Sequence, residues 1–171
     1  AAVTKQLSIL LSLAGDTGTY YFDDFVFDTV ATGPVSPLVN LLAENNPGLE
    51  TVDTAEWVLN QPDATTAGSV TFDSTAHTGS KGLHATITAI GSANWGIRVY
   101  VPAFDATKDN KYTISFWGKS DSTRPLTISF QTPTGDYQNA TDMLTLTTAW
   151  KQYSFKTTDT ATSEKMQFAL Y

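Results

Sequence analysis

The first residue whose type and position point to a binding function is a tryptophan on the polar side of a predicted strand. In residues 111–120, KYTISFWGKS, the apolar side chains Tyr112, Ile114 and Phe116 alternate with polar ones, which is typical of a half-buried strand. Trp117 falls on the polar face. An indole beside hydrogen-bonding groups suits a sugar ring, because sugar C–H groups stack on the aromatic face while the hydroxyls form directional hydrogen bonds. We therefore predict that Trp117 contacts a ligand.

Polar residues on other predicted strands share this type of face. Arg98 lies in WGIRVYV and Gln131 in LTISFQT, and Gln138 follows the turn after the latter. Amide and guanidinium donors suit sugar hydroxyls, so Arg98, Gln131 and Gln138 are predicted ligand contacts. A solvated loop position is an equal alternative for Gln138. Trp95 and Trp150 fall near apolar positions and are assigned to the core.

The residues that could carry acid–base or metal chemistry do not form a recognisable catalytic set. Asp23 and Asp24 are neighbours on a predicted strand, so they point to opposite faces and only one can reach a given site. His77 and His84 have no carboxylate at metal-binding spacing and are interpreted as turn and surface residues. No Ser/His/Asp arrangement, phosphate-binding glycine loop or zinc motif is present.

Alternating patterns separated by turn sequences recur along the chain and predict the fold. Turn chemistry appears in AGDTG, DATKDNK, SDSTRP and TPTGD, and no window of helical length shows a 3.6-residue period. The pattern predicts an all-β fold, an antiparallel β-sandwich of the jelly-roll kind. Its predicted strands cover residues 69–73, 82–89, 95–101, 112–120, 126–132, 143–147, 150–157 and 165–171.

Composition narrows the classes of partner. The chain has 171 residues, 17 acidic against 10 basic side chains and a formal net charge of −7. No basic cluster could follow a phosphate backbone, so nucleic acid and anionic membranes are not expected partners. Cysteine is absent, which excludes disulfides and thiolate metal sites, while the Thr-, Asp-, Asn- and Gly-rich composition predicts a secreted, extracellular segment.

The two ends of the chain resemble each other. Residues 29–37, TVATGPVSP, have the composition of a linker, and QLSILLSLAG at 6–15 resembles KMQFALY at 165–171. We predict that residues 1–28 carry the closing strands of a module and that 38–171 form the sandwich. A tandem array of repeats and a circular permutation both explain this order.

Six short motifs carry a resemblance to a known family. They are NNPGLE, EWVLN, STAHTGSKGLHATI, NWGIRVYVP, KYTISFWGKS and AWKQYSFKTT, in that order. Their order resembles that of the carbohydrate-binding modules of families 4, 9, 16 and 22, whose jelly rolls close on a strand similar to GTYYFDDF. Here that strand comes first. Closure within one chain is the favoured expectation, giving a monomer, and a strand-swapped dimer is the alternative.

The resemblance also implies a metal and a second aromatic contact. In similar modules the first aspartate of FDD and the glutamate of NPGLE hold a structural calcium ion, together with backbone carbonyls of the turn that corresponds to HTGSKGL. This implies Asp23 and Glu50 as Ca²⁺ ligands. The aromatic after the opening loop, here Trp57, is implied to stack on the ligand.

Three functions compete at this point. The first is a non-catalytic module of a secreted polysaccharide-degrading enzyme, binding a neutral plant-type polysaccharide such as β-glucan, cellulose, mannan or xylan. An enzyme would need a paired acid and base, for which no carboxylate pair is evident. A structural or adhesin repeat of a cell-surface protein fits the repeated ends but leaves Trp117 unexplained.

Overall fold

The chain folds into two stacked β-sheets. The computed structural model describes residues 9–12, 16–30, 47–51, 57–92, 96–100, 110–131, 138–158 and 167–170. Within these residues there are eleven strands and no helix: β1 (Ile9–Ser12), β2 (Gly18–Val30), β3 (Val58–Asn60), β4 (Ala67–Asp73), β5 (Gly82–Ala89), β6 (Arg98–Tyr100), β7 (Lys111–Ser120), β8 (Arg124–Gln131), β9 (Gln138–Leu146), β10 (Lys151–Thr158) and β11 (Gln167–Leu170). A helix long and apolar enough to cross a membrane is therefore not found in the described part of the chain.

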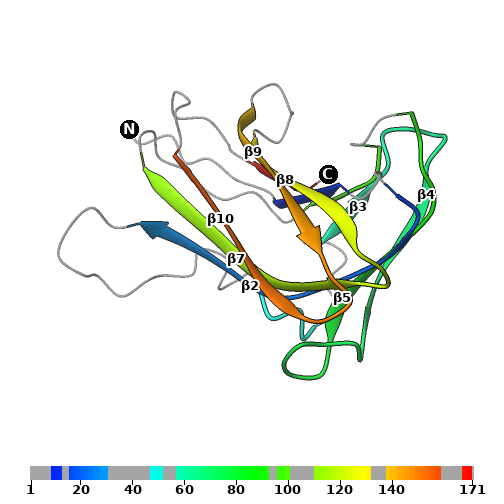
Figure 1. Ribbon diagram of the computed structural model, residues 1–171, viewed down its shortest axis with the longest axis horizontal. Coiled ribbons are helices and arrows are strands. Elements are labelled where there is room, and N and C mark those ends of the chain that lie inside the picture. Colours follow the sequence, from blue (N-terminus) through cyan, green and yellow to red (C-terminus); the bar gives the residue numbers. More distant parts are fainter. Residues whose placement is uncertain are drawn as a thin grey trace.

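Each sheet combines strands from distant parts of the sequence (Figure 1). One has six strands in the order β3-β6-β1-β11-β8-β9, and the other has five in the order β10-β7-β2-β5-β4. The pairs are antiparallel except for β1 with β11. The predicted all-β sandwich is thus confirmed.

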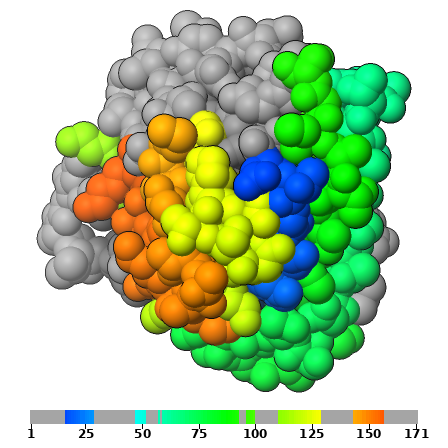
Figure 2. Space-filling model, turned by 45° about the vertical axis from the view of Figure 1, so that its right-hand side comes forward, coloured from blue at the N-terminus to red at the C-terminus, as the bar shows by residue number. Residues whose placement is uncertain are grey.

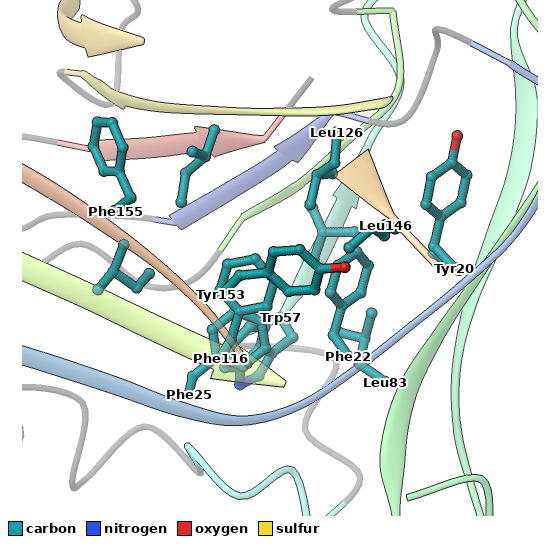
Figure 3. Close-up of a cluster of buried hydrophobic side chains, with 14 of the residues drawn as sticks. Tyr20, Phe22, Phe25, Trp57, Leu83, Phe116, Leu126, Leu146, Tyr153 and Phe155 are labelled. Carbon is teal, nitrogen blue, oxygen red and sulfur yellow. The ribbon is translucent and has the colours of Figure 1, made fainter. Parts of the chain in front are cut away.

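The core lies between the two sheets and is rich in aromatic rings (Figure 3). The rings of Phe25 and Phe116 stack with centroids 5.2 Å apart, and Trp57 lies 4.8 Å from Phe25. Leu126 and Ile128 of β8 are fully buried, as their alternation predicted. The core side chains of each strand face the opposite sheet. The residues that alternate with them therefore lie on the outer faces of the two sheets.

β2 contains a bulge that sets the direction of its side chains. The register with β7 passes from Asp23↔Trp117 to Val26↔Ser115, so β2 has one extra residue at this point. The extra residue is accommodated at Asp24. Its φ of 50° lies in the left-handed region, which aspartate tolerates better than most residues. As a result Phe22 and Phe25, three residues apart, both point into the core.

The two similar ends of the sequence lie side by side. β1 and β11 form a parallel pair with Ile9 opposite Phe168 and Leu11 opposite Leu170. This register matches the sequence similarity residue by residue. β1 also pairs with β6, and β11 with β8. The two similar strands therefore occupy neighbouring positions in one sheet of the same chain.

Arg124 holds the start of β2 against the turn between β7 and β8. Its guanidinium is 2.7 Å from carboxylate oxygens of both Asp16 and Asp121, and it also donates to the Thr17 carbonyl oxygen. Burial raises the pKa of Asp121, but hydrogen bonds from Arg124 and from backbone N–H groups, together with the charge of Arg124, leave the pKa below its ordinary value. Figure 2 shows this segment in blue at the surface, between yellow and green atoms.

The predicted division of the chain is only partly within the described residues. β2 extends to Val30, so the closing strand runs two residues into the predicted linker at 29–37. The rest of that linker lies outside the described residues. β2 pairs with β5 and β7 of the same chain and so lies inside the five-stranded sheet.

Candidate functional site

Six side chains form a row on the outer face of the five-stranded sheet, and we call this row the aromatic platform. Tyr21 of β2 pairs with Lys119 of β7 on one side and with His84 of β5 on the other. All six are half-buried. His77 lies in the turn between β4 and β5 and Trp150 just before β10, whereas the other four lie on strands whose alternate residues point to the core. The members of the platform are Tyr21, His77, His84, Trp117, Lys119 and Trp150.

His77 and Trp117 form the centre of the platform. The imidazole of His77 stacks on the indole with ring centroids 3.7 Å apart and an interplanar angle of 9°. Its Nδ1 is 2.9 Å from Oδ2 of Asp24, which fixes the ring orientation. Trp150 meets His77 edge-on, with centroids 5.8 Å apart. His77 therefore covers one face of the Trp117 indole, and that face is closed to a ligand.

The second part of the platform combines a stacked pair with a cation. His84 stacks on Tyr21 with centroids 4.5 Å apart, and its Nδ1 is 2.5 Å from Oδ2 of Asp73. The Nζ atom of Lys119 lies 4.8 Å from the ring centroid of Tyr21 and 5.1 Å from that of Trp150. Burial raises the pKa of Asp73, but hydrogen bonds from His84 and Thr75 outweigh this effect and leave the pKa below its ordinary value. The row thus offers aromatic faces together with fixed polar groups.

The turn that carries His77 is held by carboxylates from β2. Asp23 is fully buried, and its Oδ2 accepts the backbone N–H groups of His77 at 2.6 Å and Thr78 at 3.0 Å. Asp24 accepts the Thr78 hydroxyl at 2.7 Å. Both neighbouring aspartates therefore reach one turn, which corrects the expectation that they point to opposite faces. The bulge at Asp24 is the reason, because it interrupts the alternation.

Glu50 holds the other end of the same turn. Its carboxylate accepts the backbone N–H of Ser80 at 2.9 Å and the Ser80 hydroxyl at 2.7 Å. These hydrogen bonds lower the pKa of Glu50. Gly79 has a φ of 66°, in the left-handed region that favours glycine, and a Cβ there would displace the Glu50 carboxylate from its place beside the turn. The Phe25 N–H also donates to the Pro47 carbonyl oxygen at 2.8 Å, which brings the loop of Glu50 to the bulge.

These contacts do not fit the implied calcium site. Calcium takes six to eight oxygen ligands, among them backbone carbonyls, whereas here backbone N–H groups point at Asp23 and Glu50. A group of three His, Cys, Asp or Glu able to hold a metal is not found within the described residues. The structure confirms that both residues contact the predicted turn. Their role as Ca²⁺ ligands stays a prediction that the described contacts do not support.

Substituting Asp23 tests this arrangement. Burial raises the pKa of Asp23, while the N–H donors of Thr78, His77 and Asp24 act in the opposite direction. We expect Asp23→Asn to lower the free energy of unfolding by about 2 kcal/mol, because the amide keeps one acceptor oxygen and its NH₂ group can accept no hydrogen bond from the backbone N–H groups that face it. Urea titrations with calcium or with EDTA would measure it.

Asp28 on the same strand provides the matched control. Its Oδ1 is buried and has no hydrogen-bond partner among the described residues, and burial raises its pKa. Asp28→Asn is therefore expected to leave the stability unchanged or higher. Equal losses in both variants would contradict the assigned role of Asp23. A melting temperature that rises with calcium in the wild type and not in Asp23→Asn would instead favour the metal site.

The predicted ligand contacts are divided between the two sheets. Trp117 lies on the outer face of the five-stranded sheet, as its alternation predicted. Arg98 is half-buried between the buried Ile97 and Val99, so it lies on the outer face of the six-stranded sheet. Gln131 and Gln138 pair with each other in that sheet too, and their side chains lie outside the described part of the structure. Because the core separates the two outer faces, Trp117 does not share a face with Arg98, and the strands of Gln131 and Gln138 belong to the other sheet.

Two tryptophan assignments are corrected. Trp57 is 1% exposed and packs against Phe25, so its ring has no face available for a ligand. Trp150, which the sequence assigned to the core, is half-buried on the platform, next to His77. The apolar residues of β10 begin beyond it and alternate from Tyr153, which leaves Trp150 on the outer face. Trp95 lies outside the described residues.

Sequence reasoning missed the histidines as members of the site. Each has a carboxylate partner, Asp24 for His77 and Asp73 for His84, at a sequence separation of 53 and 11 residues. The second pair was accessible from the sequence, since β4 and β5 form an antiparallel hairpin that places their outer faces side by side. The first was not, because it depends on the bulge.

A β-sandwich that carries an outward aromatic platform with fixed polar neighbours has the features of a glycan-binding module. The comparison with protein families agrees with this class: residues 44–171 match the carbohydrate-binding domain family of types 4 and 9. The chain belongs to that family. No curated protein and no solved structure matches the chain. The matched range contains β3 to β11, whereas the first two strands precede it.

Proposed function

We propose that this chain is a non-catalytic carbohydrate-binding module of a secreted polysaccharide-degrading enzyme. The family supports carbohydrate binding. The observation that carries the proposal is the stack of His77 on Trp117 with Trp150 at its edge, on a face that is not buried in the core. The ligand class is a neutral plant-type polysaccharide, such as β-glucan, cellulose, mannan or xylan, which binds by aromatic stacking and hydrogen bonds to neighbouring polar groups.

The polar groups of the platform favour orientation of a ligand over chemistry on it. Asp24 and Asp73 each hold a histidine at 2.9 and 2.5 Å, and Asp23 is committed to backbone N–H groups. A glycosidase needs one carboxyl group as acid and another as base or nucleophile across the scissile bond. These three carboxylates instead hold the histidine rings and the turn of His77 in place, which supports binding without catalysis.

Affinity electrophoresis tests the proposal. Native gels that contain soluble β-glucan, mannan or xylan are expected to retard the chain, and a reducing-sugar assay on the same polymers is expected to show no release. Release of reducing sugar would show that the chain is an enzyme and would contradict the proposal of a non-catalytic module. Migration that none of the polymers changes would contradict the proposed binding of these polysaccharides.

A further inference from the structure

Lys119 is a cation held between two aromatic rings of the platform. Its Nζ atom lies 4.8 Å from the ring centroid of Tyr21 and 5.1 Å from that of Trp150. None of the ion pairs found among the described residues involves Lys119. The nearby carboxylates have other partners, since Asp24 pairs with His77 and Asp73 with His84. The ammonium group thus has aromatic neighbours but no counter-ion in the described part of the chain.

Aromatic rings satisfy such a cation only in part. They attract the charge through their π-faces but accept no strong hydrogen bond, whereas an ammonium group has three N–H donors. Those donors are left for water or for an oxygen of a ligand. A carboxylate is the strongest acceptor that a glycan offers, because its hydrogen bonds to a cation are charge-assisted.

The position of Lys119 connects it to the stacking centre. Lys119 and Trp117 lie two residues apart on the same face of β7, a separation of about 7 Å along the strand. Trp150 contacts both His77 and Lys119 and joins the two parts. A sugar stacked at the centre would therefore bring its substituents or its neighbouring sugar within reach of Nζ.

The charge of the whole chain limits what kind of acid can bind. A net charge of −7 repels a polymer with a carboxylate on every sugar, while one fixed cation suits an isolated carboxylate on an otherwise neutral backbone. We propose that Lys119 forms a subsite for the carboxylate of a uronic acid carried by a neutral polysaccharide. This inference rests on the proposed function and specifies the substrate class of the same face.

Calorimetric titration with two matched ligands tests the subsite. The probes are glucuronic-acid-bearing xylo-oligosaccharides and the same preparation after reduction of the carboxyl groups to alcohols. We expect the wild type to bind the acidic form about fivefold more tightly, and we expect 1 M salt to remove most of that preference because the pair is solvent-accessible. Lys119→Met keeps the apolar part of the side chain and is expected to abolish the preference by weakening binding of the acidic form more than that of the reduced form, whereas Lys119→Arg retains the preference.

The outcomes separate this inference from the proposed function. Equal affinity of the wild type for the two forms, or a preference that survives in Lys119→Met, overturns the uronate subsite and leaves carbohydrate binding intact. No binding of either form also overturns the subsite. The proposed function is decided separately, by the gels with neutral β-glucan, mannan and xylan.

Discussion

Replacement of Trp117 by alanine is expected to weaken glycan binding by about 30-fold, which corresponds to about 2 kcal/mol, while the fold stays intact. The indole forms the centre of the platform through its stack with His77 at 3.7 Å. It lies on the outer face of β7, so its removal leaves the core unchanged. Titration of the variant with the polysaccharide that retards the wild type measures the loss.

Two further variants make this result specific. Ser115→Ala changes the same face of β7 two residues away and is expected to bind as the wild type does. His77→Ala uncovers the indole and separates two arrangements: binding is lost if the sugar stacks on His77 and is kept or improved if it stacks on Trp117 itself. Unchanged affinity in a folded Trp117→Ala variant would exclude the platform as the glycan site.

Replacement of Phe25 by alanine is expected to lower the free energy of unfolding by about 3–5 kcal/mol. Phe25 belongs to β2, is 1% exposed and packs against Trp57 and Phe116 with ring centroids 4.8 and 5.2 Å away. The change leaves a cavity at a point where β2 is joined to the centre of the core. Urea denaturation of the purified chain, followed by tryptophan fluorescence, measures the effect.

Val26 is the control for Phe25, because it is the next residue of the same strand and is 36% exposed on the outer face. Val26→Ala is expected to change the stability by less than about 1 kcal/mol. Similar losses in the two variants would contradict the bulged register of β2.

We propose that closure by β2 occurs within one chain, and light scattering should then give a monomer for the wild type. A stable dimer would favour strand exchange between copies instead.

The sequence by itself determined most of the strands, the all-β class and the buried face of β7. Alternation in KYTISFWGKS predicted that Tyr112, Ile114 and Phe116 are buried and that Trp117 is not, and the structure confirms both. This was possible because the period of two is a local property, fixed by the pleat of one strand. The motif order, likewise readable in one dimension, identified the family that the chain matches over residues 44–171.

Only the tertiary structure decided which of these faces belong together. Alternation states that a residue points outward but not from which sheet, so Arg98 and Trp117 looked alike although the core separates them. The predictions for Trp57 and Trp150 were wrong for a similar reason. Trp57 is buried and Trp150 lies on the platform, because burial depends on what the opposite sheet supplies. The bulge at Asp24 is a pairing property of two strands, and it brought both aspartates and His77 to one turn. The site is assembled from contacts distant in sequence, and these follow from sheet order and register, which no single strand encodes.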